Sequence, residues 1–390
     1  MGTTILDCAL SILSNHIGTH NREQRGAAVY IAVTIWNNLR DKSTNLFLLA
    51  NKRAHMNSKL INSEEKPQSS IYTVAFWKHH PIADQNASAL NLDIAAFYQR
   101  VPTDVIKLTP AGNYQVAERG GVAHWQQDIL GRRSFTTRYV KSEYELHELA
   151  KLPEKLTDLE AQIVEAGRTL VIKNTRPVYA TVFTPLTQLF MLCGQNQLVE
   201  SILQSPQLVL TVLNKLTSLT RLLIREYIKA GITHFYLAMQ HRASEILPCA
   251  LYNKLGDTSD NELITFLQNE LPQNNELPNI VVHVHGEQVY FYGLPNNKNV
   301  AIHYELGDEN LSIETFCRQR QNELVVGLPL SFWENCTTDD LKKEIQAAAQ
   351  LTGQNRIVFT APCVVPLAIP EKSIAQWVNK FSEAISNLTI

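Results

Sequence analysis

Two histidines in one short apolar run, His283 and His285, are the residues best suited to metal chemistry in this sequence. They stand in NIVVHVHG (279–286), and because alternate side chains of a β-strand point to the same face, both imidazoles can reach one site. Cys363 follows a second apolar run, RIVFTAP (356–362), and offers a sulfur ligand. A catalytic zinc site uses three protein ligands and leaves a fourth position open. The sequence therefore predicts a metal site at these three residues, with a metal-free histidine pair lining a pocket as the alternative.

Other polar side chains stand at or near the ends of apolar runs. As substrate-binding residues the sequence suggests the following set: Trp77, Lys78, His79, His80, Lys107, Thr184, Gln240 and Tyr304. The lysine and histidines of 77–80 would suit an anionic group, although a lysine at such a position can also be simply solvated. His241 and Glu287 are the candidate catalytic residues, with Glu287 as a base or as a partner that orients a ligand histidine. The alternatives are a polar wall residue for His241 and a solvated carboxylate for Glu287.

Eight short runs rich in β-branched and aromatic residues would position these side chains. They lie at 71–76, 104–110, 177–185, 233–239, 279–286, 300–306, 323–329 and 356–362. Nearly all are apolar along their length, which is typical of strands buried on both faces of a parallel sheet. Helical patterns fill several gaps, at 87–100, 141–169 (interrupted at Pro153), 196–230 and 337–353. This alternation predicts an α/β fold, a (β/α)8 TIM barrel with its site at the carboxyl ends of the strands. An open doubly wound sheet is the alternative, but no GxGxxG follows any strand.

The first 60 residues stand apart from this pattern. AAVYIAVTIWNNL (27–39) has helical character, and the polar stretch NSEEKPQSS (62–70) precedes the first strand. We therefore expect an N-terminal helical extension over 1–60 and a barrel over 61–390.

The composition excludes some classes of partner. The chain has 390 residues, a formal net charge of −2 and a pI near 6.6, which give no electrostatic reason to expect nucleic acid or an anionic membrane. No apolar run approaches the ~18 residues that a membrane helix needs. The six cysteines are scattered without a CxxC pair, which is typical of reduced thiols. We expect a soluble cytoplasmic protein that acts on a small molecule.

Six segments, in order along the chain, carry a resemblance to a known family: VAFWKHHP (74–81), AFYQRVPTDVIKLTPAGNY (96–114), TVFTPLTQLFMLCG (181–194), VVHVHGE (281–287), AIHYELGDENLS (301–312) and FTAPCVVPLAIP (359–370). They resemble the uroporphyrinogen decarboxylase superfamily, which includes corrinoid-dependent methyltransferases and the barrels of cobalamin-independent methionine synthase. The resemblance covers roughly residues 50–385 and implies a (β/α)8 barrel, in agreement with the strand count.

The chain departs from the decarboxylases at two positions. Where they carry an arginine-rich motif after the first strand, this chain reads FWKHHP, and where they carry an aspartate after the second strand it reads VIKLTPAG, with Lys107 as the nearest charge. A lysine cannot accept hydrogen bonds from pyrrole N–H groups. The methyltransferase branch binds zinc through His-x-Cys and a later Cys; His283 and Cys363 match two of these ligands, and His285 replaces the first cysteine. The resemblance thus implies a zinc-bound substrate thiolate that accepts a methyl group.

Three functions stay open on the sequence alone. The first is a zinc-dependent methyltransferase-like enzyme, with a corrinoid as the methyl donor and a corrinoid protein or a second copy of the chain as partner. The second is a metal-free decarboxylase of a carboxylated tetrapyrrole, of the uroporphyrinogen III to coproporphyrinogen III type, which needs no cofactor. The third is a barrel that binds a small ligand without catalysis.

Overall fold

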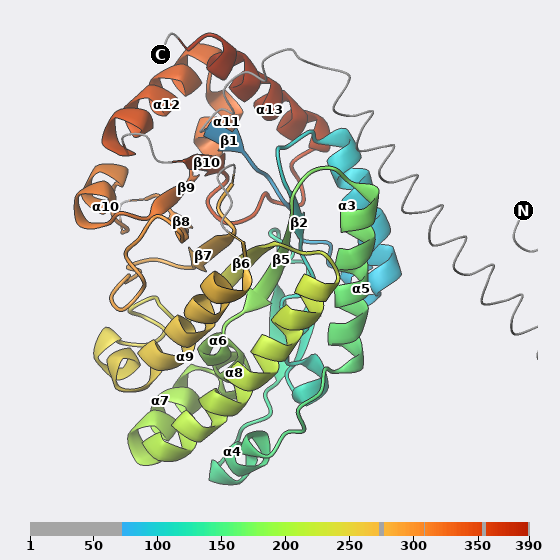
Figure 1. Ribbon diagram of the computed structural model, residues 1–390, viewed down its shortest axis with the longest axis vertical. Helices are drawn as coiled ribbons and strands as arrows, with labels where there is room; N and C mark the ends of the chain where they lie inside the picture. Colours follow the sequence, from blue (N-terminus) through green and yellow to red (C-terminus); the bar gives the residue numbers. More distant parts are fainter. Residues whose placement is uncertain (1–71, 273–276, 308, 353–355, 389–390) are drawn as a thin grey trace, which may run out of the picture. The chain divides into compact units, whose positions relative to one another are not determined.

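The structure is a computed structural model that describes residues 72–272, 277–307, 309–352 and 356–388 (Figure 1). The expected helical extension over 1–60 and the linker over 62–70 lie outside the described residues. The predicted boundary between extension and barrel therefore stays a prediction.

All eight predicted strands form, and they pair in parallel in one sheet. They are β1 (Tyr72–Val74), β2 (Ile106–Leu108), β5 (Val178–Phe183), β6 (His234–Met239), β7 (Ile280–Val284), β8 (Ala301–Glu305), β9 (Glu323–Gly327) and β10 (Ile357–Thr360). The order across the sheet is β1-β10-β9-β8-β7-β6-β5-β2. The strands therefore follow the chain around the sheet, as in a β/α barrel, and β1 and β2 are left as its two edges.

Hydrogen bonds outside the regular strand pairing join these two edges. The backbone N–H of Asp104, just before β2, donates to the carbonyl of Val74 at 3.2 Å, and the Val74 N–H donates to the Asp104 carboxylate at 2.8 Å. The buried hydroxyl of Tyr98 donates to the Phe76 carbonyl at 3.2 Å and accepts from the Lys107 N–H at 2.9 Å. The predicted barrel is confirmed, and one backbone hydrogen bond and the side chains of Asp104 and Tyr98 join the two edge strands, which no strand ladder pairs.

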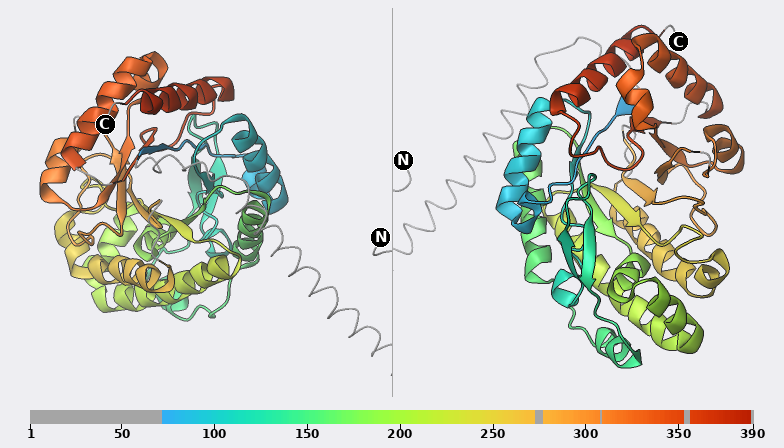
Figure 2. Two further views of the ribbon diagram at one scale, coloured as in Figure 1. Left: turned by 45° about the horizontal axis from the view of Figure 1, so that its top comes forward. Right: turned by 180° about the vertical axis from the view of Figure 1, so that it is seen from behind.

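Helices surround the sheet, and Figure 2 shows them as a ring outside the strands. Their bounds are α3 (Ala87–Arg100), α4 (Glu143–Ala150), α5 (Asp158–Lys173), α6 (Pro185–Cys193), α7 (Gln195–Gln204), α8 (Pro206–Lys229), α9 (Cys249–Glu270), α10 (Ile313–Gln319), α11 (Leu330–Asn335), α12 (Thr338–Thr352) and α13 (Glu371–Ser386). The helix predicted at 87–100 is confirmed as α3. The pattern at 141–169 becomes two helices, α4 and α5, each starting with a capping box. The pattern at 196–230 is likewise divided before Pro206, which is well suited to a first helical turn.

Side chains alternate between the two faces of the sheet, most clearly on β7. On β7, Ile280, Val282 and Val284 belong to the large core between strands and helices, whereas Val281 belongs to a smaller cluster inside the barrel. The inner cluster holds one residue from each of the other six strands besides β1 and β2, namely Tyr179, Tyr236, Val281, Ala301, Val325 and Val358, together with Ala75 just after β1 and Val105 just before β2. Residues in step with these, such as His283 on β7, therefore point into the barrel.

An antiparallel hairpin interrupts the alternation of strands and helices. It consists of β3 (Val122–Trp125) and β4 (Arg133–Thr137), and short 3-10 turns lie at Ala83–Gln85 and Ala117–Arg119. The hairpin follows β2 and carries Arg132 and Arg133 to the cavity described below. Within the described residues, no helix is long and apolar enough to span a membrane.

Candidate functional site

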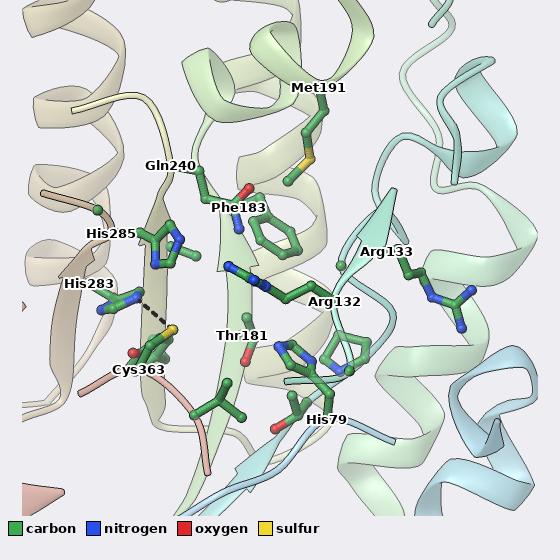
Figure 3. Close-up of a pocket in the computed structure, with 18 of the residues that line it drawn as sticks. His79, Arg132, Arg133, Thr181, Phe183, Met191, Gln240, His283, His285 and Cys363 are labelled. Carbon is green, nitrogen blue, oxygen red and sulfur yellow. Dashed lines mark hydrogen bonds between the residues drawn. The ribbon is translucent and has the colours of Figure 1, made fainter. Parts of the chain in front are cut away.

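A cavity of about 300 Å³ opens at the carboxyl ends of the strands. Its aromatic and apolar wall includes Trp77, Phe135, Phe183, Phe190, Met191 and Tyr236. Its polar lining includes His79, Lys107, Thr109, Arg132, Arg133, Thr181, Gln240, His283, His285 and Cys363. Figure 3 shows His283, His285 and Cys363 on one side of this cavity and His79 and the two arginines on the other. The volume is at the lower end of the range for small-molecule sites, which suits a small ligand.

The structure brings the three predicted metal ligands together. One ligand atom from each of His283, His285 and Cys363 lies within 4.8 Å of the other two. The Cys363 sulfur lies 3.5 Å from Nε2 of His283, as marked in Figure 3. His283 comes from β7, His285 follows this strand on the same face, and Cys363 follows β10. The site therefore depends on β7 and β10, which are distant in sequence and separated by β8 and β9 in the sheet, and whose side chains meet inside the barrel.

Burial keeps the two histidines in the form that binds metal. It lowers the pKa of His285 to about 4 and that of His283 well below the usual histidine value, with further lowering at His283 from His303, His285 and Lys107. Both imidazoles are thus neutral at pH 7 and each has a lone pair available. Burial raises the pKa of the Cys363 thiol to about 12, whereas Lys107 and Arg132 oppose this rise. Without metal the thiol is protonated, so a bound metal would have to displace its proton.

Neighbouring groups lie beside the two imidazoles. A backbone group of His303 opposes the lowering of the His283 pKa, and Nε2 of His283 faces the Cys363 sulfur. Glu305 Oε1 lies 3.9 Å from Nδ1 of His285, and burial raises the pKa of this carboxyl. Carbonyls and carboxylates next to ligand histidines are the usual second layer of a zinc site.

Two residues at this level of the barrel did not figure in the sequence prediction, His303 on β8 and Tyr236 on β6. The Tyr236 hydroxyl lies 2.7 Å from Nδ1 of His303, and its ring stacks on His283 with centroids 5.4 Å apart. His303 is fully buried, and burial and Lys107 lower its pKa to about 3. The alternation of side chains along β8 could have identified His303, since His303 shares a face with Ala301, which points into the barrel.

Lys107 rises from β2 into the same space. Its ammonium nitrogen lies 4.3 Å from the centroid of the Tyr236 ring and 5.2 Å from that of Trp77. Burial lowers the pKa of Lys107 to about 7. Within the described residues, no acceptor forms a hydrogen bond with this nitrogen and no carboxylate pairs with it.

The other cations of the cavity do have acidic partners. Arg132 pairs with Asp128 at 2.9 Å, and Arg133 pairs with Asp84 and donates to the Pro81 carbonyl at 2.8 Å. The guanidinium of Arg132 extends across the cavity towards His285 in Figure 3. No apolar run ends at Arg132, so the strand-end pattern could not identify it.

Four of the eight residues suggested for substrate binding line the cavity: Trp77, His79, Lys107 and Gln240. At His79, burial and Lys107 lower the pKa to about 3, so its imidazole is neutral. His79 and Gln240 lie on opposite sides of the cavity, with the Arg132 side chain between them in Figure 3. The cavity therefore offers polar contacts from β1, β2 and β6.

The other four do not line the cavity. Lys78 donates to the backbone carbonyls of Leu367 and Ile369, and His80 pairs with Asp93 at 2.7 Å. Thr184 is fully buried, with its hydroxyl 3.2 Å from that of Thr187. Tyr304 faces the helices and packs on Phe291 and Phe316, because it is out of step with the inward residues of its strand. These side chains stabilise the rim and the outer core.

The two candidate catalytic residues also lie apart from the cavity lining. His241 is fully buried, with Nε2 3.0 Å from the Asp260 carboxylate and Nδ1 2.9 Å from the Thr187 hydroxyl. Asp260 is also fully buried and accepts from Tyr252 at 2.8 Å. Glu287 is exposed. The structure thus assigns His241 to a buried polar network and brings neither residue to the metal ligands.

Comparison with known proteins identifies structures but no sequence relatives. No protein-family model and no curated protein matches the sequence. A methyltransferase from Methanosarcina mazei has a similar structure, with a TM-score of 0.62 and 14% identity over 83% of this chain and 95% of the other. A B12-independent methionine synthase from Shewanella sp. W3-18-1, in complex with selenomethionine, gives a TM-score of 0.51 and 12% identity over 81% and 97% of the two chains. At these identities the likeness establishes the fold: this chain has the β/α barrel of those enzymes.

Proposed function

We propose that this chain is a zinc-dependent methyltransferase-like barrel that activates a small thiol at His283, His285 and Cys363. The observation that carries the proposal is the distance of 3.5 Å between the Cys363 sulfur and Nε2 of His283. A tetrahedral zinc ion with ordinary Zn–S and Zn–N bonds separates two such ligand atoms by about 3.6 Å. The donor set of two neutral imidazoles and one thiol is one that zinc accepts.

Three protein ligands leave the fourth position of a tetrahedral ion to the substrate. Zinc bound there would supply Lewis acidity, which lowers the pKa of a coordinated thiol. Lys107 and Arg132 add positive charge that favours a thiolate, as their effect on the Cys363 pKa indicates. The aromatic wall, with Trp77, Phe183 and Tyr236, excludes water and strengthens these interactions.

The fold of the two similar enzymes supports this proposal, since one is a methyltransferase and the other a methionine synthase. The corrinoid donor that the sequence resemblance implies stays a prediction, as does a corrinoid protein or a second copy as partner. A tetrapyrrole decarboxylase is less favoured, because a cavity of about 300 Å³ is small for such a substrate. Among the described lining residues the one carboxylate is Glu245, which is exposed at the rim, so the lining of the interior offers no carboxylate to accept hydrogen bonds from pyrrole N–H groups.

Zinc analysis of the purified protein tests the proposal. We expect about one zinc per chain after zinc supplementation and dialysis, and a large loss of zinc in His283→Ala and Cys363→Ala. His124→Ala and Cys249→Ala are matched controls, since His124 is exposed on β3 and Cys249 begins α9, away from the cavity. Zinc-free protein under all conditions, or equal zinc in all four variants, would refute the site.

A further inference from the structure

Lys107 differs from every other charged residue of the cavity. It is 5% exposed, it lies on the inner face of β2, and its nitrogen faces two aromatic rings without an acidic partner among the described residues. Arg132 and Arg133 in the same cavity each have an aspartate. An unpaired ammonium is costly to bury, and proteins normally pair such a group or use it.

The cations of the cavity are Lys107, Arg132 and Arg133, and an aspartate partners each arginine. Two further carboxylates lie near the cavity, Glu245 at the exposed rim and Glu305 beside His285, and within the described residues neither pairs with Lys107. A divalent metal at the three ligands would add positive charge, since Cys363 is the one ligand there that becomes an anion. An anionic group on the ligand would offset it, and the low dielectric of an aromatic pocket would make that contact strong.

The position of Lys107 relates this charge to the metal ligands. One ring, that of Tyr236, contacts both the Lys107 nitrogen at 4.3 Å and the His283 imidazole at 5.4 Å. Lys107 also shifts the pKa values of Cys363, His283 and His303, which shows electrostatic coupling across the cavity. A small ligand can therefore contact the metal ligands with one end and Lys107 with the other.

We propose that Lys107 forms an anion subsite on the floor of the cavity, so that the substrate is a small thiol that also carries a carboxylate. Lys107 is a specificity-determining residue in this arrangement, and it forms an ion pair with the carboxylate while the metal ligands position the thiol end. The binding of the thiol at the metal ligands rests on the proposed function. The binding of the carboxylate at Lys107 does not depend on a metal and applies to the metal-free protein as well.

Binding of three small probes to the full chain tests thiol binding at the metal ligands and carboxylate binding at Lys107 separately. The probes are 3-mercaptopropionate, which has both groups, 2-mercaptoethanol, which has a thiol without charge, and propionate, which has a carboxylate without thiol. In zinc-loaded protein we expect 3-mercaptopropionate to bind at least tenfold more tightly than 2-mercaptoethanol, as measured by calorimetry. Lys107→Met should bind the two thiols with similar affinity and keep its zinc.

A matched variant controls for the loss of a lysine. Lys380 donates to the Cys336 carbonyl at 2.8 Å and lies on α13, outside the cavity lining, so Lys380→Met should keep the tenfold preference. Met is close to Lys in length and removes a buried charge, so Lys107→Met should fold, and its thermal unfolding verifies this. Lys107→Gln provides a second neutral variant.

The outcomes distinguish the two proposals. If the wild-type chain holds no zinc and 2-mercaptoethanol does not bind, the proposed function fails. Propionate measured against propionamide then decides the anion subsite, which is supported if propionate is preferred and Lys107→Met abolishes the preference. If folded Lys107→Met and Lys107→Gln keep the wild-type preference for the carboxylate probe, the anion subsite is overturned.

Discussion

The hydroxyl oxygen of Tyr98 accepts a hydrogen bond of 2.9 Å from the backbone N–H of Lys107. Tyr98 lies on α3 and is almost fully buried, and the same hydroxyl donates to the carbonyl of Phe76. These two backbone groups belong to the two edges of the sheet. One side chain therefore closes the barrel at the level where Lys107 turns into the cavity, which couples the fold to the site.

Tyr98→Phe should destabilise the barrel. The change keeps the ring and leaves the buried N–H of Lys107 and the carbonyl of Phe76 without this partner, which costs about 1–3 kcal/mol. We expect a lower urea midpoint for Tyr98→Phe, whereas Tyr144→Phe, which alters a tyrosine that is 68% exposed, should match the wild type. Equal midpoints for all three proteins would show that water or a small shift of the backbone replaces the hydroxyl.

Much of the fold can be predicted from the sequence because each strand of a parallel sheet is buried on both faces. The resulting apolar runs place all eight strands correctly. The β3–β4 hairpin cannot be found in this way, since three of the five residues of β4 are exposed and β3 alternates without a continuous apolar run. Its chain direction and its approach to the cavity are set by tertiary packing.

The site is predictable to a different degree at each strand. Because alternate side chains of a β-strand point to the same face, the sequence predicts that His283 and His285 share a site. The same rule places His303 inside the barrel and Tyr304 on the outer face of β8. At the strand ends the rule loses force, because the chain leaves the sheet at different angles. His241 lies two residues after β6 and contacts Asp260 outside the cavity, whereas Arg132 reaches the cavity from a loop without a regular hydrophobic pattern.

Asp260→Ala tests whether His241 has a structural role. Asp260 contacts His241 at 3.0 Å and lies 3.9 Å from the buried guanidinium of Arg242. Its removal leaves a buried cation without an anion, so we expect a loss of about 3–5 kcal/mol in the free energy of unfolding. Asp339→Ala, at an exposed aspartate in the first turn of α12, should cost far less.

The zinc content of folded Asp260→Ala should equal that of the wild type, because His241 and Asp260 do not line the cavity. A variant with wild-type stability and a changed zinc content or altered probe binding would instead place this network in the functional machinery.

Glu305→Gln tests the second layer of the metal site. The Glu305 carboxylate lies 3.9 Å from Nδ1 of His285 and is the acidic group next to this ring. Loss of such a partner typically lowers metal affinity about 10–100-fold. We expect a competing chelator to remove zinc from Glu305→Gln at a correspondingly lower concentration, whereas Glu314→Gln, at the exposed first turn of α10, should behave as the wild type. Equal zinc affinity in both variants would assign Glu305 to the substrate or to solvent.

The metal-free protein should lose stability in acid because of its buried histidines. The pKa of His303 is lowered to about 3, whereas in the unfolded chain it is about 6.5. Between these values the unfolded state binds a proton that the folded state does not, so stability is complete above pH 6.5 and falls as the pH is lowered towards 3. Each such histidine contributes a slope of up to about 1.4 kcal/mol per pH unit, and His234, with its pKa lowered to about 4, adds to it.

His303→Gln should remove one histidine from this slope. We expect its urea midpoint to fall less steeply than that of the wild type between pH 6.5 and 4.5, although the lost contact to the Tyr236 hydroxyl lowers its stability at pH 7. His124→Gln should keep the wild-type slope, since His124 is exposed on β3 and does not line the cavity. The loss of the hydrogen bond alone would lower the urea midpoint by the same amount at every pH. The test of His303 is therefore the change of the midpoint with pH and not its value at one pH. Parallel curves for the wild type and His303→Gln would mean that His303 binds its proton over the same pH range in the folded and the unfolded chain.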